Sequence, residues 1–530
     1  MGNWRKSYVL GAALLASVAA GAFACNAATR GGKMIYARYA DSLFLDPVLN
    51  DANVDIWVLT NLYDTLLSPT PDGQGVTPAL ATKWDYASDG KTLTLTLRSD
   101  VKFSDGAPMS ADDVIWSLDR ARDPKAGEWN FTLAAIDTME AKDPATVVLH
   151  LKHADPTLLA GLATFNSAIL PKAAFEASPG GNAEEKAKAF AEHPIGTGPF
   201  AFASWKHGEV MKLKRNPYYW KMADDGKPLP YLDELEFPVI PDDSTRLLKL
   251  KAGEVDGAEF IPYSRVQELK ADPNLRMELW PSTRVRYLLT FNGEKYKDGS
   301  KNPLGDPKVR QALNYAINKQ AIIQITTLNL GKPMTSFMST ATPLHSGDKE
   351  LYPVDPAKAK ALLAEAGYAN GFEFSCLALT GNGDDQSDLT AAQQMWAQIG
   401  VKLKIELVDN PTRTAKYRAE DFQCRTSQWT DDIADPSEIT SYFAYYPNIH
   451  SLHSGFQDKQ IDALFEKSQQ ETDAKARAAQ FKEIQDRYNA AAPIVYLYET
   501  PYPVAFRKNA KGFVQIPLGN NLFEKAYVEH

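Results

Sequence analysis

An alternation of strand-like and helix-like segments between residues 372 and 429 constrains the fold more than any other feature. The strand-like runs are FEFSCLAL, VKLKIELV and DFQCRTSQW, and the helical runs DLTAAQQMWAQIG and PTRTAKYRAE lie between them. This βαβαβ order predicts parallel strands joined by right-handed crossovers, in an α/β fold. Ligands of such sheets bind beyond the carboxyl ends of the strands. We therefore expect a binding site where the third strand ends, at QWTDDIADP.

The sequence around this unit reads as further strands and helices. Period-2 runs, KTLTLTLRSDVKF and TVVLHLK, flank a helix in MSADDVIWSLDRA that Ser110 and Asp113 begin. Asp-Pro pairs open a long helix, VRQALNYAINKQAIIQITT, and a second one, AKAKALLAEAGY. Two extended aromatic segments, PSTRVRYLLTFN and APIVYLYET, flank the βαβ-rich block. They are expected to cross twice between two lobes.

The N-terminus predicts export. Arg5 and Lys6 precede an apolar run that ends in small residues, which is typical of a secretory signal peptide over residues 1–24. Cleavage after the small-x-small sequence that ends at Ala24 and lipidation of Cys25 both stay open. The mature protein is expected in the periplasm, either free or anchored through a lipid on Cys25.

Charge and cysteine usage exclude other classes. The chain has 57 Lys and Arg against 66 Asp and Glu, without the basic excess that nucleic acid binding requires, so no nucleic acid partner is expected. Three cysteines do not make a disulfide scaffold. Cys376 and Cys424 lie in two strand-like runs, where we favour two buried thiols over a bridge because a bridge between adjacent strands needs particular geometry.

The three aspartates of QWTDDIADP have different expected roles. Asp435 precedes Pro436, with Glu438 three residues later, which is a helix-start pattern. Asp431 is expected to face solvent or to set the loop. No nucleophile elbow, HExxH motif, P-loop or pair of acids on one face accompanies them, so no enzymatic activity, catalytic residue or cofactor is predicted.

Several blocks of the sequence resemble family 5 solute-binding proteins of bacterial ABC importers. They are similar in the same order and at similar spacing, over nearly the whole chain after the signal peptide. The blocks are the run from LYDTLLSPTPDG to MSADDVIWSLDRA, then PIGTGPFAFASWKHGEVMKLKRNPYYW, DPKVRQALNYAINKQAII and DPAKAKALLAEAGY.

The resemblance implies a periplasmic-binding-protein-like type II fold of two lobes, with an additional α+β domain inserted in the first lobe. On this basis the first lobe comprises residues 31–70, 198–284 and 492–530. The additional domain comprises residues 71–197, and the βαβ-rich second lobe residues 285–491.

The resemblance also implies a ligand site, and no metal-ligating residue is predicted in it. Peptide-binding relatives hold the ligand's α-ammonium with an aspartate three residues after a tryptophan, and Trp429 and Asp432 stand at that spacing. The aromatic on the helix after the SDG-P turn is Trp116, and the tyrosine of the last crossing strand is Tyr498 or Tyr496. Arginines that hold a ligand carboxylate vary in the family; the nearby candidates are Arg418 and Arg425.

The implied function is capture of a peptide or peptide-like amine and its delivery to an ABC permease in the cytoplasmic membrane, by a monomer. The alternative is a non-peptide solute on the same fold, such as an opine, a glycoside or a metal chelate. The pair His450 and His453 is the weak candidate for contact with a chelate.

Overall fold

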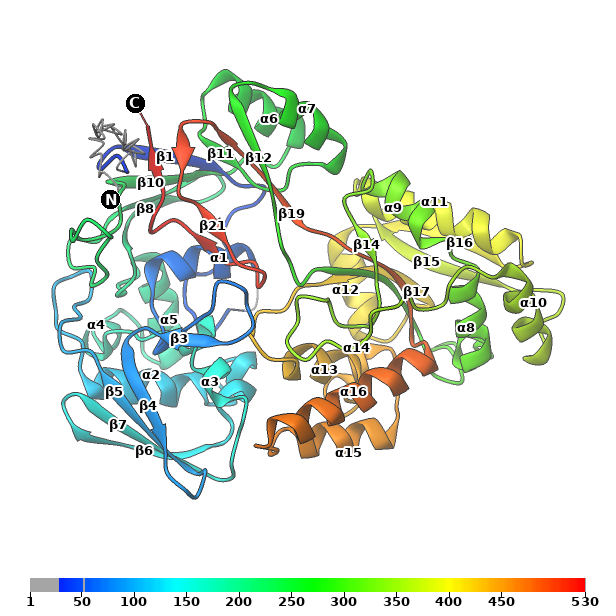
Figure 1. Cartoon of the computed structure of the whole chain (residues 1–530), viewed down its shortest axis with the longest axis horizontal. Coiled ribbons are helices and arrows are strands. Elements are labelled where there is room, and N and C mark those ends of the chain that lie inside the picture. The colour runs from blue at the N-terminus through cyan, green and yellow to red at the C-terminus, as the bar shows by residue number, and fades with distance from the viewer. Residues whose placement is uncertain (1–27, 51–52, 530) are drawn as a thin grey trace, which may run out of the picture.

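The computed structural model describes residues 28–50 and 53–529, so the predicted signal peptide and Cys25 lie outside the described residues. The chain forms two lobes joined by two neighbouring extended segments (Figure 1). Within residues 28–50 and 53–529, no helix combines the length and the apolar character needed to cross a membrane.

The first lobe is built on a seven-stranded sheet of order β12-β19-β11-β1-β10-β9-β8. Its strands are β1 (Lys33–Ala37), β8 (Phe200–Lys206), β9 (Val210–Arg215), β10 (Glu234–Pro238), β11 (Gly257–Ala258), β12 (Leu275–Trp280) and β19 (Tyr502–Arg507). The helices are α1 (Asn53–Leu62), α6 (Asp243–Ala252) and α7 (Val266–Ala271), with the 3-10 helix η3 (Tyr263–Arg265). Short strand pairs complete it: β2 (Leu67–Pro69) with β3 (Val76–Pro78), β20 (Ala510–Lys511) with β23 (Tyr527–Val528), and β21 (Val514–Gln515) with β22 (Asn521–Leu522).

An additional domain interrupts the first lobe between β3 and β8. Its antiparallel sheet has the order β4-β5-β7-β6, from β4 (Ala81–Tyr86), β5 (Thr92–Leu97), β6 (Ile136–Asp143) and β7 (Thr146–Leu151). The helices are α2 (Ala111–Ala121), α3 (Leu158–Gly161), α4 (Lys172–Glu176) and α5 (Ala183–Glu192), with η1 (Glu128–Leu133) and η2 (Phe165–Ser167). The capping box predicted from Ser110 and Asp113 is confirmed at the start of α2.

The second lobe contains a six-stranded sheet of order β14-β18-β13-β17-β15-β16. Its strands are β13 (Val285–Thr290), β14 (Lys332–Pro333), β15 (Glu373–Leu379), β16 (Lys402–Val408), β17 (Cys424–Trp429) and β18 (Ile494–Glu499). The helices are α8 (Pro307–Tyr315), α9 (Lys319–Thr326), α10 (Pro356–Glu365), α11 (Gly383–Ala397), α12 (Asn410–Arg418), α13 (Ser437–Phe443), α14 (His450–His453), α15 (Lys459–Ser468) and α16 (Ala474–Ala491), with η4 (Pro303–Gly305).

The βαβαβ prediction is confirmed, because β15 pairs in parallel with both β16 and β17. The single long helix predicted after Asp306 is wrong. The chain forms α8 and α9 instead, because Asn318 caps a new helix start and accepts the backbone N–H of Ala321.

The two lobes are connected where β12 runs into β13 and where β18 runs into β19. β12 pairs with β19 in the first lobe, and β13 pairs with β18 in the second, so the two connections lie side by side. Because β18 belongs to the sheet of the second lobe, we propose the second crossing at Thr500 and Pro501, later than residue 492.

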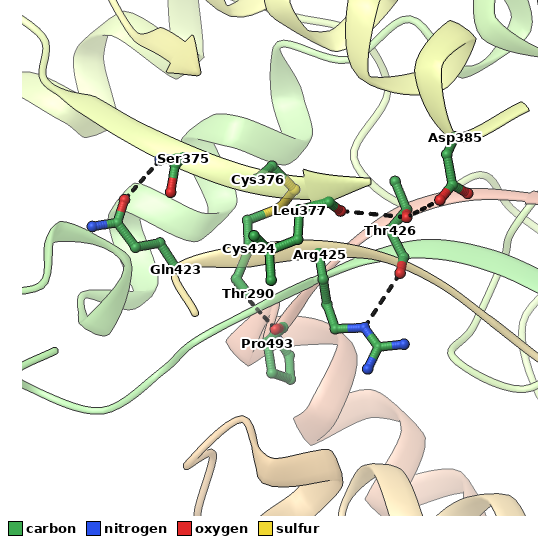
Figure 2. The surroundings of a disulfide bond; sticks show 10 residues. All are labelled: Thr290, Ser375, Cys376, Leu377, Asp385, Gln423, Cys424, Arg425, Thr426 and Pro493. Atoms are coloured by element: carbon green, nitrogen blue, oxygen red, sulfur yellow. Dashed lines mark hydrogen bonds between the residues drawn. A yellow bond between two sulfur atoms is a disulfide. The ribbon is translucent and has the colours of Figure 1, made fainter. Parts of the chain in front are cut away.

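Cys376 and Cys424 form a disulfide, so the expectation of two free thiols is wrong (Figure 2). The sulfur atoms are 2.17 Å apart, and the Cα atoms 4.3 Å apart. Leu377 of β15 and Arg425 of β17 are partners in the sheet, which places the two preceding cysteines side by side. That register follows from tertiary pairing, which neither local sequence run reveals.

Candidate functional site

Three carboxyl side chains gather in and just after the loop that follows β17. We name Asp431, Asp432 and Glu438 the acid cluster. Asp431 and Glu438 are fully buried, and Asp432 is partly buried. Of the two roles expected for Asp431, facing solvent is therefore wrong, and setting the loop agrees with its hydrogen bonds.

The position of Asp431 is fixed by neighbours from both sides of the loop. Its carboxylate accepts hydrogen bonds from Thr342 Oγ1, at 2.6 Å, and from Trp429 Nε1, at 3.1 Å. Its backbone N–H donates to Thr283 Oγ1 at 2.8 Å. These contacts turn Asp431 inward, and they were invisible in sequence because Thr283 and Thr342 are remote along the chain.

The other two carboxyl groups retain oxygens without partners. Glu438 Oε2 accepts the backbone N–H groups of Asp432 and Ile433, at 2.8 and 2.9 Å. Glu438 Oε1 and Asp432 Oδ1 are buried and have no hydrogen-bond partner. Among residues 28–50 and 53–529, no Lys or Arg forms an ion pair with the acid cluster. The cluster therefore lacks the cation that its burial demands.

Burial dominates the electrostatics of the acid cluster. It raises the pKa of Asp431 from 3.8 to about 7. Burial, followed by the neighbouring charge of Asp431, raises the pKa of Asp432 to about 8. Burial and the same two aspartates raise the pKa of Glu438 well above its ordinary value. A bound cation would reverse these effects, because it stabilises the charged carboxylates.

Asp435 is structural, as predicted, but its expected role as the N-cap is wrong, because the N-cap of α13 is Pro436, which makes no side-chain cap hydrogen bond. Asp435 Oδ1 accepts the N–H of Ser437, at 2.8 Å, where α13 begins. Both of its oxygens also accept hydrogen bonds from Arg477, at 2.7 and 2.8 Å. The capping-box role expected for Glu438 is wrong, because this side chain binds the amides of Asp432 and Ile433 instead.

Two cavities are lined by residues next to Asp432, although Asp432 itself lines neither of them. The first, about 270 Å³, is lined by Arg284 just before β13, by Arg286, Asp384 and Thr430 of the second lobe, and by aromatic rings of the first lobe. We call it the arginine-lined cavity. The second, about 500 Å³, is lined by Ile433 and lies between the additional domain and the helices α13 and α15. We call it the uncharged cavity, because none of the residues that line it carries a formal charge. These residues are Phe131, Thr132, Thr157, Gly161, Ile433, Ser437, Ser441, Tyr445, Pro447, Asn448, Phe465 and Gln469.

Aromatic rings of the first lobe face the arginine-lined cavity. Trp57 stacks on Phe260 with ring centroids 5.5 Å apart, and Tyr502 packs edge-on against both. The hydroxyl groups of Tyr502 and Thr430 are 2.9 Å apart, a hydrogen bond between the lobes. On the opposite side, Arg284 donates to Gln428 Oε1 at 2.5 Å.

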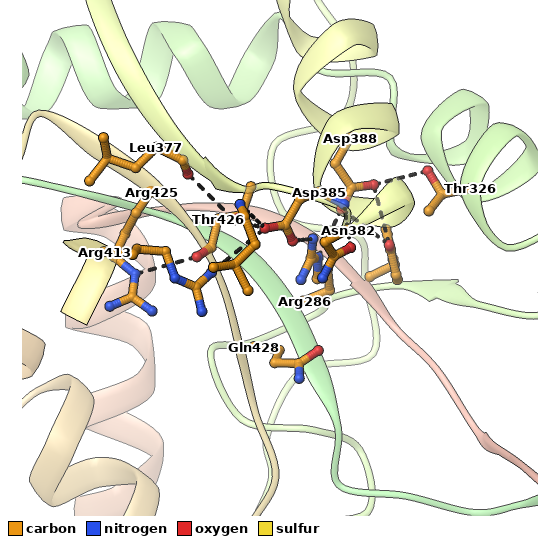
Figure 3. A network of polar contacts seen from close by, with 12 residues as sticks. Arg286, Thr326, Leu377, Asn382, Asp385, Asp388, Arg413, Arg425, Thr426 and Gln428 are labelled. Atoms are coloured by element: carbon orange, nitrogen blue, oxygen red, sulfur yellow. Dashed lines mark hydrogen bonds and ion pairs between the residues drawn. The ribbon is translucent and has the colours of Figure 1, made fainter. Parts of the chain in front are cut away.

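A buried ionic network supports the wall of this cavity (Figure 3). Arg286 lies between Asp385, at 2.5 Å, and Asp388, at 2.8 Å, both on α11. Asp385 also accepts a hydrogen bond from Thr426 at 2.7 Å, which connects α11 to β17. Arg286 is therefore committed to two carboxylates.

The predicted aromatic contacts occupy different surroundings. Trp429 lies at the end of β17, against Tyr442 and Phe443. Tyr498 is buried, and its hydroxyl donates to Asp388 at 3.2 Å. Tyr496 is also buried, and its hydroxyl donates to Asn489 Oδ1 at 3.1 Å.

Trp116 on α2 packs against Phe175 with ring centroids 4.9 Å apart, and it lines neither of the two cavities. Its role as a ligand contact stays a prediction.

The predicted arginines differ in exposure. Arg418 is exposed at the end of α12. Arg425 is partly buried on β17, with its guanidinium 4.4 Å from the Tyr417 ring centroid, and its Nε donates to the Thr426 carbonyl at 3.4 Å. Burial lowers the pKa of Arg425. Neither arginine lines the two cavities, and their roles toward a carboxylate stay predictions.

His450 and His453 both approach Glu420, at 2.6 and 3.9 Å. In the part of the chain that the structure describes, no group of three His, Cys, Asp or Glu residues could hold a metal ion.

Two lobes with cavities between them, and a loop bearing unpaired carboxylates beside those cavities, define a two-lobed ligand-binding protein. A family model described as bacterial extracellular solute-binding proteins, family 5, matches residues 75–451. The chain belongs to this family, whose members serve as the solute-binding components of ABC importers. The type II two-lobe fold implied by the resemblance is confirmed.

Individual relatives cover nearly the whole chain. The glutathione-binding protein GsiB of Salmonella typhimurium is 30% identical over 482 residues, which is 89% of this chain and 90% of that protein. The structure of the periplasmic binding protein DppA from Helicobacter pylori with the peptide STSA has a TM-score of 0.81 and 26% identity, covering 95% and 99% of the two chains. AgaA from A. tumefacien R10 with agropinic acid has a TM-score of 0.78 and 28% identity, covering 94% and 99%.

Proposed function

We propose that this solute-binding protein captures a peptide or peptide-like amine between its lobes and delivers it to an ABC permease. The observation that carries the proposal is the acid cluster, with two buried oxygens that lack a partner and no compensating cation in the described chain. A ligand ammonium would supply charge-assisted hydrogen bonds to Asp432. Relatives that bind glutathione and the peptide STSA support a ligand of this chemistry.

Binding requires contacts from both lobes. The ligand ammonium would meet Asp432 of the second lobe, while Tyr502 of the first lobe closes over the same loop through Thr430. A ligand that interacts better with the closed form than with the open form shifts the population toward closure. The closed form then presents both lobes to the permease, and the ligand leaves chemically unchanged.

An opine is the second candidate, because AgaA with agropinic acid is similar over 94% of this chain. Arg284 supports this candidate, since it lines the arginine-lined cavity, forms no ion pair with a described residue and could bind an acidic group of the ligand, although Asp384 lines the same cavity. A glycoside or a metal chelate has no comparable support from the site. Export through residues 1–24, the monomeric state and the lack of enzymatic activity remain parts of the proposal, and a lipid on Cys25 stays an open alternative to a free protein.

Native mass spectrometry of the protein purified from the periplasm tests the ligand class. A retained ligand with the mass of a peptide, lost from Asp432→Asn, would support the peptide proposal. A retained opine would favour the second candidate. Calorimetry with synthetic peptides then measures affinity, and wild-type affinity in Asp432→Asn would remove Asp432 from the site.

A further inference from the structure

The acid cluster contains more carboxyl groups than one ligand ammonium can neutralise. Asp431 and Glu438 are fully buried, and Asp432 is partly buried. Within residues 28–50 and 53–529, no cation acts on any of the three. Three ionised carboxylates that are buried together would repel one another and would lack hydration. The empty protein must therefore keep protons on the acid cluster at neutral pH.

The hydrogen bonds of the cluster indicate which groups hold these protons. Glu438 uses Oε2 to accept two backbone N–H groups of the loop, at 2.8 and 2.9 Å, and its Oε1 is buried without a partner. Asp432 Oδ1 is also buried without a partner. Asp431 differs, because its two oxygens accept hydrogen bonds from Thr342 and Trp429. Such bonds favour the charged form, so Asp431 should ionise first as the pH rises.

The pKa values agree with this order. Burial raises the pKa of Asp431 to about 7, and burial together with the neighbouring Asp431 raises the pKa of Asp432 to about 8. Burial, followed by the charges of both aspartates, raises the pKa of Glu438 well above its ordinary value. At pH 7, Asp432 and Glu438 therefore carry protons, and Asp431 is about half ionised.

Neighbours from the first lobe and the additional domain bring no positive charge to the cluster. Burial raises the pKa of the Tyr502 hydroxyl on β19, so this group is uncharged at neutral pH. Asp155 of the additional domain is itself a carboxyl group, and it interacts electrostatically with Asp435. Neither group can take the place of a ligand cation.

The charged groups of the second lobe are engaged elsewhere or lie apart from the cluster. Arg477 of α16 forms an ion pair with Asp435, at 2.7 Å. Arg284, just before β13, lines the arginine-lined cavity together with Asp384, and it forms no ion pair with a described residue. The protons on the acid cluster are therefore its own compensation for burial.

A bound ammonium group would change this balance at Asp432. Its N–H groups donate to the carboxylate, which favours the ionised form. The proton of Asp432 then leaves to solvent, while the ammonium keeps its own protons, so one positive charge replaces another. Glu438 is fully buried beside both aspartates and keeps its proton.

We propose that the acid cluster exchanges a proton for the ammonium group of the ligand, so that binding releases roughly one proton at neutral pH and weakens in acid. This inference rests on the proposed function. It adds a regulation of the ammonium site, because the ligand is held at neutral pH and released as the pH falls. Asp431 and Glu438 act through Asp432, since they determine how firmly Asp432 holds its proton.

Calorimetry of the full mature protein tests the exchange. The probe is whichever of Ala-Ala, Ala-Ala-Ala and reduced glutathione binds most tightly, and its N-acetyl form is the control without an ammonium group. At pH 7, binding enthalpies in phosphate and in Tris, which differ in ionisation enthalpy, should show a release of about 0.5–1 proton per ligand. Kd should rise about 5- to 10-fold from pH 7 to pH 6, where the amino group of the probe stays mostly protonated.

One variant locates the proton in the acid cluster. Asp431→Asn removes a charged neighbour of Asp432 and should lower the proton release at pH 7 to about half of the wild-type value or less. Asp256→Asn is the matched control, since burial also raises the pKa of Asp256 and its carboxylate accepts a backbone N–H, but it lies in the first lobe, outside the cluster. The control should release as many protons as the wild type.

The outcomes separate the inference from the proposed function. A probe that binds through its ammonium group, with the same enthalpy in both buffers and the same Kd at pH 6 and pH 7, would overturn the inference alone. A proton release that persists undiminished in Asp431→Asn would also overturn it. If no probe binds, or if the N-acetyl form binds equally well, the proposed function fails and the inference fails with it.

Discussion

The substitution Asp432→Asn should weaken ligand binding and stabilise the unliganded protein. These opposite effects follow from one feature, a buried carboxyl group that has no cationic partner. Asparagine keeps the shape of the side chain and removes its charge. A residue that merely held the loop would instead lose stability on substitution.

The pKa of Asp432 sets the size of the stability effect. It is about 8 in the folded protein against 3.8 ordinarily. At pH 7 the carboxyl group is ionised in the unfolded chain and largely protonated in the folded protein. Because pH 7 lies roughly 3 pH units above the ordinary pKa, this protonation lowers the free energy of unfolding by at most about 4 kcal/mol. Because the loop can relax and admit water, we expect a gain of about 1–2 kcal/mol. Loss of the charged hydrogen bond to the ligand should raise Kd by about 10- to 100-fold.

Urea unfolding at pH 7 measures the first effect, and calorimetry with an amine-bearing peptide measures the second. The matched control is Asp435→Asn, which breaks the buried pair with Arg477 and should destabilise by roughly 3–5 kcal/mol. An Asp432→Asn protein that is less stable than the wild type, or that binds the peptide equally well, would refute the reasoning.

Three further predictions concern pH, the disulfide and the ionic network. The pKa values of Asp431 and Asp432 are raised to about 7 and 8, so the stability that their protonated forms provide is complete below about pH 4 and is lost as the pH rises to 8. Thermal melting of the unliganded protein at a series of pH values should show this decline. The substitution Asp432→Asn should make the decline smaller. Replacing Cys376 and Cys424 by serine should lower the free energy of unfolding measured in urea by about 4 kcal/mol, because the disulfide closes a loop with a sequence separation of 48 in the unfolded chain. An unchanged free energy of unfolding would contradict this prediction. Arg286→Met should lower the free energy of unfolding by about 3–5 kcal/mol in the same assay, because Asp385 and Asp388 on α11 lose their cation. A loss below about 1 kcal/mol would show that the ionic network does not stabilise the protein.

The fold could be predicted where periodicity and caps act locally. The alternation from residue 372 to 429 gave the parallel strands correctly, and Ser110 marked the start of α2. Long-range pairing escaped prediction. The disulfide depends on the register between β15 and β17, and the burial of Asp431 depends on Thr283 and Thr342, which are distant in sequence.

The sequence predicted a ligand site in this loop, but it did not reveal the electrostatics of the acid cluster. The spacing of Trp429 and Asp432 predicts ligand contacts there, which stay predictions, whereas Glu438 was assigned only to the start of a helix. Its orphaned oxygen and its bonds to two loop amides exist only in the folded chain. The position of Glu438, six residues after Asp432, was the one sequence signal that could have indicated the third carboxyl group of the acid cluster.

The acid cluster also bears on how ligand binding could be communicated to the permease. Tyr502 of the first lobe covers the loop through its hydrogen bond with Thr430. Burial raises the pKa of the Tyr502 hydroxyl, and the nearby Asp432 adds to this effect, so the lobes interact electrostatically at this point. When the lobes part, water can hydrate the ionised carboxylates. When the lobes close without a ligand, that hydration is lost and the carboxyl groups must take up protons, which costs free energy at neutral pH. Closure is therefore unfavourable for the empty protein at neutral pH. On the proposed function, a ligand ammonium would remove the penalty only in the closed form, and this differential interaction would shift the population toward closure.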